Sequence, residues 1–359
     1  MALDRIPRSL WGYEDVGRVH LSLSGTLLET LADPCFQARV YGIVDCGSLL
    51  WHLQNTRTVD VLGSAYYHPV LPFIPPADRE EQIARWLGIG RHLFGRERFR
   101  GFWPPELGFC TDLVPTLSRR DYEWVIVDSE HVEPVTPMRW EELRYRLHRA
   151  RVGDAEIVVV VRDRDLSNAQ ESRMDAGWFI EEVRARTQHC DFPPLVTTAT
   201  DGDNGGWFRN TTHNSNFWGS FYTELAERVR ADRTGGIRPA LISDYLDRHG
   251  AHGWATVDPG AWNTGEHHGA GFVQWTGSAA QRDALARVGQ LSDAVHAAGD
   301  RVNGDAAVAG LLEQARWRVL RAQTSCNFYR GEAWVHRCHN DLDAATTHLD
   351  QALRAPSHG

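Results

Sequence analysis

The chain has 359 residues, and 38 basic against 47 acidic side chains give it a formal charge of −9. This charge excludes the electrostatic footprint of a nucleic-acid-binding protein. All 38 basic residues are arginine, which excludes pyridoxal-phosphate enzymes, Walker A nucleotide-binding proteins and protein kinases, because each needs a lysine amine. The 14 tryptophans, 9 tyrosines and 13 phenylalanines include rings that could stack on sugar faces, although core packing explains most of them.

Cysteine usage and the lack of long apolar runs indicate the cellular setting. The six cysteines are scattered without a CxxC pair: Cys35, Cys46, Cys110, Cys190, Cys326 and Cys338. This spacing predicts reduced thiols and no structural zinc site. No charged-then-apolar leader opens the chain, and no apolar run approaches the length of a membrane span. We therefore expect a cytoplasmic protein that does not bind a membrane.

Short apolar or β-branched runs alternate with amphipathic segments over much of the chain. In chain order, the predicted strands lie at residues 18–22, 59–64, 99–103, 124–128, 156–161 and 195–200, and amphipathic helices are predicted at 79–94 and 170–186. Strands that alternate with helices predict a parallel α/β sheet or barrel.

The composition changes after about residue 278. Residues 279–353 are rich in Ala, Leu, Arg, Asp and Glu and predict several helices. Residues 235–259 and a Gly-rich loop at 260–277 separate these helices from the strands. We expect a barrel domain at residues 1–278 and a helical subdomain at 279–359, although the helices could equally complete a single domain.

Polar side chains follow three of the predicted strands. The strands at 59–64, 99–103 and 195–200 lead into Tyr67 and His68, Glu106, and Asp201, respectively. Active sites of parallel barrels form at the carboxyl ends of the strands, so we expect these side chains at one mouth. Two carboxylates among aromatic rings fit cleavage of a glycosidic bond, in which one attacks or stabilises and the other donates the proton.

Each of these residues also has a plainer interpretation. Glu106 could be a solvated loop residue, and His68 a hydrogen-bonded structural histidine. The run that begins at Asp201 could be turn-forming, or a calcium loop that lacks the later ligands. His267 and His268 follow Glu266, but adjacent histidines point in different directions on any regular element. We therefore expect no metal and no cofactor.

A set of short motifs, in the same order along the chain, resembles glycoside hydrolase family 57. The matching blocks are residues 19–29, 59–74, 101–106 (GFWPPE), 162–167 (RDRDLS), 201–204 (DGDN), 260–262 with 275–277, and 325–326. Each block is weak alone, but the ordered set, which covers roughly residues 18–335, is specific.

The resemblance implies an α/β fold, an incomplete (β/α)7 barrel with a C-terminal helical subdomain. It implies a retaining α-glycosidase or α-glucan transglycosylase that acts on an α-linked oligosaccharide or glycoside. Glu106 matches the nucleophile of the family and Asp201 its general acid/base. Retention needs their carboxyl groups about 5–5.5 Å apart, and the acid must stay protonated near neutral pH. The implied substrate-binding residues are His68, Tyr67, Trp103, Trp207, Trp262 and Trp275.

The sequence departs from the family pattern in three places. The family opens with a strand that ends in His-Gln-Pro, whereas residues 1–17 contain no histidine. We expect either that this strand is replaced or lost, or that the chain is a divergent member with a remodelled subsite. Asp203 stands where the family has glutamate, and Cys326 stands where aspartate is common. Both carboxylates remain, but a long α-glucan becomes a doubtful substrate.

Two other functions compete with a glycosidase. A metal-dependent hydrolase similar to polysaccharide deacetylases could use Asp201 or Asp203 with His68, His213 or His267, but no HxxxH spacing follows a strand end. A non-catalytic, regulatory sugar-binding barrel would fit the missing His-Gln-Pro strand, although it would have no need of both carboxylates.

Overall fold

A run of parallel strands that pair in chain order forms the centre of the fold. The computed structural model describes residues 2–202, 207, 210, 212, 215–265, 269, 271–299 and 305–355. The parallel pairs are β1 (Val19–Ser22) with β2 (Val59–Leu62), β3 (Gly101–Phe102) with β4 (Trp124–Asp128), and β4 with β7 (Ala155–Arg162). Parallel bridges from Gly63 to Phe102 and from Arg162 to Thr197 extend the series. The carboxyl ends of all these strands therefore lie at the same edge.

The central strand β4 is buried on both faces. Every residue of β4, with the sequence WVIVD, is buried, as parallel strands covered by helices require. Glycine allows the close packing between strands, since a Cβ added to Gly101 would lie 2.2 Å from the ring of Trp124. The predicted strands at 18–22, 59–64, 99–103, 124–128 and 156–161 are confirmed to within two residues at each end. In the predicted strand at 195–200, only Thr197 forms a bridge.

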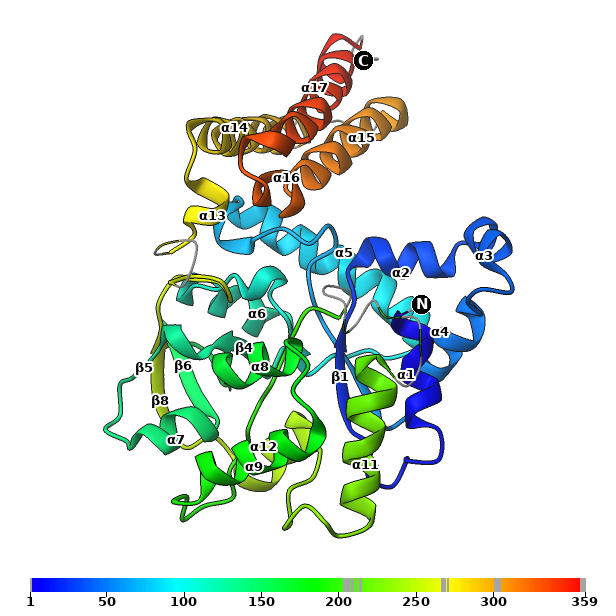
Figure 1. Cartoon of the computed structure of the whole chain (residues 1–359). Helices are drawn as coiled ribbons and strands as arrows, with labels where there is room; N and C mark the ends of the chain where they lie inside the picture. The colour runs from blue at the N-terminus through cyan, green and yellow to red at the C-terminus, as the bar shows by residue number, and fades with distance from the viewer. Residues whose placement is uncertain are drawn as a thin grey trace.

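Helices connect and cover the strands (Figure 1). They are α1 (Ala2–Leu10), α2 (Gly25–Ala32), α3 (Pro34–Val40), α4 (Cys46–Asn55), α5 (Pro76–Phe94), α6 (Val114–Arg119), α7 (Trp140–Tyr145), α8 (Arg164–Glu171), α9 (Ala176–Thr187), α11 (Thr223–Arg230), α12 (Ile242–His249) and α13 (Val273–Thr276), with short turns η1 (Leu71–Phe73), η2 (Pro105–Leu107), η3 (Thr111–Leu113) and η4 (Ser129–His131) and the π-helix η6 (Phe217–Tyr222). Before β1, residues 2–10 form the helix α1.

The single helix predicted at 170–186 is wrong. Two helices, α8 and α9, occupy this stretch, because Arg173 adopts a left-handed conformation with φ 73° and Asp175 caps the second helix. The Asp175 side chain accepts a hydrogen bond from the amide of Trp178, which satisfies one free donor of the first turn.

Three strands were not predicted from the sequence. β6 (His148–Val152) pairs antiparallel with β7, and β8 (Gly253–Val257) pairs parallel with β6 and antiparallel with β5 (Val132–Pro134). Prediction placed β8 in a separating segment, but it completes the six-stranded sheet β3-β4-β7-β6-β8-β5.

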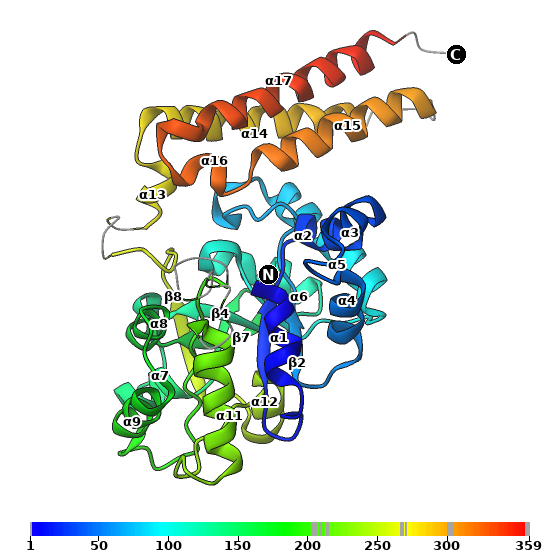
Figure 2. The same ribbon diagram turned by 45° about the vertical axis from the view of Figure 1, so that its right-hand side comes forward.

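The last helices form a layer across one end of the strand-containing part (Figure 2). They are α14 (Ala279–Gly299), α15 (Ala306–Ala322), α16 (Cys326–Tyr329) and α17 (Glu332–Arg354). Part of this layer has its own core, which includes Leu312 and Leu349. A second core joins it to the strand-containing part, because Phe328 and Leu342 pack in one cluster with Val70 and Ala261.

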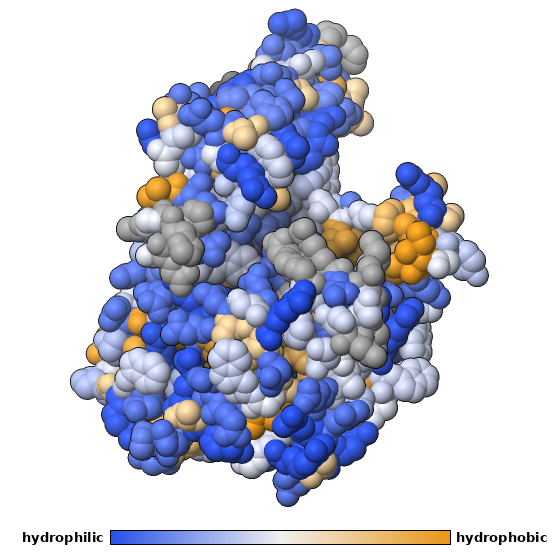
Figure 3. Space-filling model, in the orientation of Figure 1, coloured by the Kyte–Doolittle hydropathy of each residue, from blue (hydrophilic) through white to orange (hydrophobic). Residues whose placement is uncertain are grey.

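The surface is mainly hydrophilic on the face shown in Figure 3, and its apolar areas are small and scattered. The largest exposed apolar side chains include Trp11, Tyr41, Ile43 and Trp51. Within the described ranges, no helix is both long enough and apolar enough to cross a membrane.

Candidate active site

Two residues beyond neighbouring strand ends, His68 and Glu106, have left-handed backbones. His68 follows β2 with φ 57°, and Glu106 lies in η2 after β3 with φ 59° and ψ 15°. Residues other than glycine pay about 1–3 kcal/mol for such conformations, which persist where the surroundings fix them and which concentrate at functional sites. Here the strand ends are tied together, since the amide of Gly63 donates to the carbonyl of Gly101 and that of Trp103 to the carbonyl of Gly63.

The Glu106 carboxylate receives a hydrogen bond on each oxygen. Ser325 Oγ donates to Oε1 over 2.8 Å, and Trp262 Nε1 donates to Oε2 over 3.2 Å. His68 Nδ1 lies 3.8 Å from Oε1 and 3.3 Å from Ser325 Oγ. The Glu106 side chain is only 12% exposed. A carboxylate held from both sides keeps one orientation, and its burial limits the number of water molecules that can solvate it.

The backbone of the Trp262 loop also contacts the nucleophile candidate. The amide of Trp262 donates to the carbonyl of Glu106, and Phe109 and Gly260 exchange two backbone hydrogen bonds. The ring of Trp262 meets that of Trp103 edge-to-face, with centroids 5.8 Å apart. These contacts place two of the predicted aromatic residues, Trp103 and Trp262, beside Glu106.

Ser325 comes from the helical layer and was not among the predicted site residues. Its amide donates to the carbonyl of His68, and Thr324 forms an antiparallel bridge with Pro69. The motif at 325–326 was noted in the sequence, but its contact with Glu106 depends on how the helical layer docks. No local sequence signal carries that information.

The neighbouring thiol of Cys326 is not a competing nucleophile at neutral pH. Burial raises the pKa of Cys326, and the charge of Glu106 raises it further. The protonated thiol is the weaker nucleophile. The raised pKa therefore makes the Cys326 thiol less reactive than that of an unperturbed cysteine.

The other predicted aromatic residues lie in different surroundings. Trp207 is 7% exposed and packs in the main core, while Trp275 is 1% exposed and packs near Phe73 and Tyr329. Their rings therefore offer little area to a sugar. Tyr67 is half-buried, with its ring against Tyr66 and Trp317, and burial raises its pKa.

Asp201 lies beyond the bridge at Thr197 and is half-buried. The segment before it is fixed, because Arg162 Nε donates to the carbonyl of Ala199 over 2.7 Å. Asp203, His213, Glu266, His267 and His268, which entered the alternative interpretations, lie outside the described residues.

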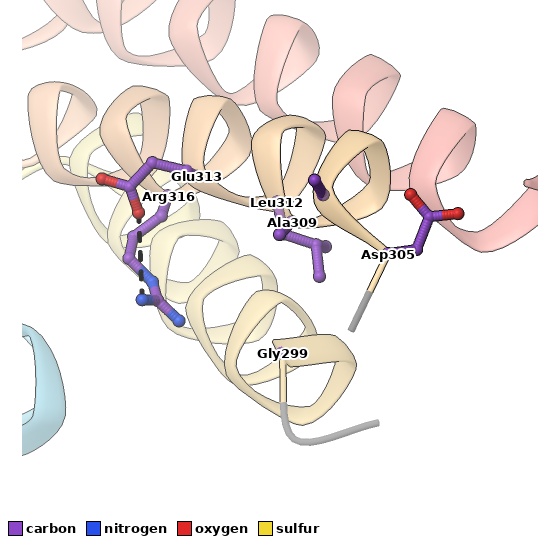
Figure 4. A pocket seen from close by; sticks show the side chains of 7 residues that line it. Gly299, Asp305, Ala309, Leu312, Glu313 and Arg316 are labelled. Carbon is purple, nitrogen blue, oxygen red and sulfur yellow. Dashed lines mark ion pairs between the residues drawn. The ribbon is translucent and has the colours of Figure 1, made fainter. Parts of the chain in front are cut away.

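A cavity of about 580 Å³ lies away from these residues, between α14 and α15 (Figure 4). Its lining includes Gly299, Asp305, Leu312, Glu313 and Arg316. None of the predicted site residues lines it, so it contributes nothing to the arrangement around Glu106.

No group of three or more metal-binding side chains gathers within the described ranges.

The geometry at the strand ends can be compared with known proteins. A family model described as glycosyl hydrolase family 57 matches residues 4–258, more than half of the chain. The chain belongs to glycosyl hydrolase family 57. This membership confirms the resemblance drawn from the ordered motifs and places the protein in a class of carbohydrate-active enzymes.

Curated relatives match parts of the chain. An α-amylase of Pyrococcus horikoshii is 32% identical over 201 residues, which make up 56% of this chain and 30% of the relative. A 4-α-glucanotransferase of Thermococcus kodakarensis is 32% identical over 114 residues, 32% of this chain and 16% of the relative. The chain thus spans less than a third of these relatives.

Solved structures of the family share the fold. A branching enzyme of Pyrococcus horikoshii superposes with a TM-score of 0.72 at 15% identity, over 98% of this chain and 83% of its own. The α-amylase AmyC of Thermotoga maritima gives a TM-score of 0.68 at 13% identity, over 98% of this chain and 86% of its own. At these identities the similarity establishes the α/β fold with its helices.

Proposed function

We propose that the protein is a retaining α-glycosidase or α-glucan transglycosylase that acts by double displacement on an α-linked oligosaccharide or glycoside. The observation that carries this proposal is the Glu106 carboxylate, which has a left-handed backbone and one hydrogen-bond donor on each oxygen. We assign Glu106 as the nucleophile and Asp201 as the general acid/base.

In the first half-reaction, a Glu106 oxygen attacks the anomeric carbon while the bond to the leaving oxygen breaks. Asp201 gives its proton to that oxygen, and a glycosyl ester of Glu106 remains. In the second half-reaction, Asp201 takes a proton from water or from a sugar hydroxyl. The oxygen of that acceptor attacks the anomeric carbon, releases the Glu106 carboxylate and restores the original configuration. Ser325 and Trp262 orient the carboxylate through both steps. His68 and the half-buried Trp262 line the sugar position beside it, and the buried Trp103 supports the ring of Trp262.

The acceptor in the second half-reaction decides the product: water gives hydrolysis, whereas a sugar hydroxyl gives transfer. The matching curated relatives include an α-amylase and a 4-α-glucanotransferase, and both reactions share the first half-reaction. We therefore propose the common intermediate and treat the acceptor as an outcome of the experiment.

The proposal extends to the architecture and the location of the protein. We propose an incomplete (β/α)7 barrel at residues 1–278 and a helical subdomain at 279–359. The parallel pairings in chain order and the separate core of the last helices support this division. We propose a cytoplasmic location, which the six free cysteines support.

The test is product analysis on maltoheptaose and shorter α-glucosides. We expect Glu106→Gln to lower kcat/KM by about 10³-fold or more, and Asp201→Asn by roughly 10²–10⁴-fold. Glu133→Gln is the matched control, because Glu133 is an exposed glutamate of β5. Its activity should equal that of the wild type.

Two further measurements identify the mechanism. The first product seen by NMR should have the α configuration, and azide should restore turnover to Glu106→Ala with formation of a β-glycosyl azide. A β-configured first product, or full activity of Glu106→Gln, would overturn the assignment. Binding of maltoheptaose without turnover would instead support a sugar-binding protein.

A further inference from the structure

Three charged side chains, at the ends of β4 and β7 and at the start of α8, form a fully buried cluster, here called the clamp: Asp128, Arg162 and Arg164. Arg162 Nη1 donates to Asp128 Oδ2 over 2.7 Å, and Arg164 Nε donates to Asp128 Oδ1 over 2.7 Å. None of the three is more than 3% exposed. Breaking such a cluster leaves a buried charge without its partner, so its geometry is strongly fixed.

One arm of the clamp holds the segment that leads to Asp201. Arg162 Nε donates to the carbonyl of Ala199, two residues before Asp201, over 2.7 Å. Ser167 Oγ accepts from the amide of Ala199 over 3.1 Å. The amide of Asp163 donates to the carbonyl of Thr197. The backbone before Asp201 is thus tied to β7 and to the first turn of α8.

The other arm holds the loop that carries Trp262. Arg164 Nη1 donates to the carbonyl of Thr264 over 2.7 Å. Thr264 Oγ1 accepts in turn from the amide of Ala261 over 2.9 Å. Trp262 lies inside this turn and donates to Glu106 from both its ring and its backbone amide. Arg164 therefore acts on Glu106 through a single rigid turn.

We propose that the clamp sets the position of the general acid relative to the nucleophile, with Arg162 as the positioning residue for Asp201 and Arg164 as the positioning residue for Glu106. The inference rests on the proposed function. Asp128 is the common anchor, because each of its oxygens holds one guanidinium. A displacement of about 1 Å between reacting groups can cost about 10²-fold in rate, so a fixed anchor between the two segments has a large effect on activity.

Substrates with different leaving groups distinguish the role of Arg162 from that of Arg164. An α-glucosyl fluoride loses fluoride without protonation, so cleavage of its bond does not need the acid, whereas maltoheptaose needs it. The ratio kcat/KM reports the steps through formation of the glycosyl-enzyme. We expect Arg162→Lys to lose about 10²-fold on maltoheptaose but little on the fluoride, and Arg164→Lys to lose similar factors on both substrates.

Control variants keep this comparison falsifiable. Arg151→Lys is the matched control, since Arg151 is an exposed arginine of β6 that pairs with Glu156, and its activity should be unchanged. Ser167→Ala removes the acceptor of the Ala199 amide without changing a charge, and it should reproduce the pattern of Arg162→Lys in milder form. Circular dichroism and thermal unfolding of each variant verify that it is folded.

The outcomes separate the two proposals. Equal losses on both substrates for Arg162→Lys and Ser167→Ala would show a general structural role and overturn the inference alone. A wild-type protein that turns over neither substrate would overturn the proposed function, and the inference with it. Selective loss on maltoheptaose by both acid-side variants supports the clamp.

Discussion

At the scale of single residues, the site depends on conformations that local sequence preferences oppose. Neither His68 nor Glu106 is a glycine, yet both adopt a left-handed backbone conformation with positive φ. Each is held by a partner distant in sequence, His68 by the amide of Ser325 and Glu106 by the amide of Trp262. The tertiary structure therefore supplies what the local sequence does not favour.

Ser325→Ala tests how far Glu106 depends on its donor from the helical layer. A hydrogen bond to a charged acceptor contributes about 1.5–3 kcal/mol, and its loss frees the carboxylate to leave its reactive orientation. We expect kcat/KM on maltoheptaose to fall by about 10–100-fold, and the thermal midpoint to fall as well, because the buried carboxylate loses a donor.

A second buried serine is the matched control for this variant. Ser292 in α14 is buried, and its hydroxyl has no hydrogen-bond partner in the part of the chain that the structure describes. Ser292→Ala should therefore retain wild-type kcat/KM. If Ser325→Ala also retained it, the donor would have no role in catalysis.

Sequence reasoning located the segments of the site but not its contacts. Glu106 and His68 were predicted because polar residues directly follow buried strands, a local pattern. The contacts of Ser325 and the clamp were not predicted, because they join residues 34 to 257 positions apart. Trp207 and Trp275 were predicted to stack on sugars, yet both are almost fully buried, since tryptophan content alone does not separate core from surface.

At the scale of elements, β4 and β7 were predictable from their continuous apolar runs, whereas β6, with a mixed sequence, was not. β4 and β7 are buried and β-branched, and both were predicted. β6, with the sequence HRARV, alternates buried and exposed residues and carries two arginines, so its pattern is weak. Its pairing depends on β7 and β8 on either side. Such an element is specified by its neighbours more than by its own residues.

A buried histidine links β1 to α12 and makes this junction sensitive to pH. His20 Nε2 accepts from the amide of Ile242 over 3.1 Å, and its ring packs against Trp124 at 5.6 Å. Burial lowers the pKa of His20 to about 4, so it stays neutral in the folded state while the unfolded chain takes up a proton below about pH 6.5.

Stability should therefore fall as the pH drops from about 6.5 to about 4. Because the unfolded state binds more protons in this window, we expect His20 to account for a loss on the order of 2 kcal/mol in the free energy of unfolding. Urea denaturation at several pH values measures it. His20→Gln keeps an acceptor that does not titrate, and its stability should depend less on pH than that of the wild type.

An exposed histidine is the control for this titration. His336 lies on α17 at the surface, and His336→Gln should follow the pH dependence of the wild type. If His20→Gln followed it as well, protonation of His20 would not be the cause of the acid loss.

At the scale of the whole molecule, one buried carboxylate adds to the shared core that attaches the helical layer to the strand-containing part. Asp78, in the first turn of α5, is 1% exposed and accepts from His296 of α14 over 3.0 Å and from Gln323 at the end of α15. Gln82 accepts from the amide of Tyr67 and donates to Gln323. The network thus runs from the helical layer to the residue before His68.

Asp78→Asn should weaken this attachment. The variant replaces an acceptor oxygen by an amide donor that faces buried donors, and an unsatisfied buried group costs about 1–3 kcal/mol. We expect the first transition in urea denaturation, followed by tryptophan fluorescence, to shift to lower urea by a corresponding amount. The kcat on maltoheptaose should fall in parallel, because Ser325 moves with the layer.

An exposed aspartate provides the comparison. Asp343 on α17 has a side chain that is 66% exposed and pairs with Arg287, so Asp343→Asn should cost less than about 1 kcal/mol. Equal shifts for Asp78→Asn and Asp343→Asn would argue against a special role for the buried network.

The distance along the chain between Glu106 and Ser325 has a consequence for biosynthesis. The two residues are 219 positions apart, so at ordinary translation rates about 10–40 s pass between their emergence from the ribosome. The nascent strands can pair during that interval, but the nucleophile still lacks one of its two donors. Full enzymatic activity should therefore appear only once Ser325 has emerged and docked against Glu106, so it reports on docking of the helical layer as well as on folding of the strands.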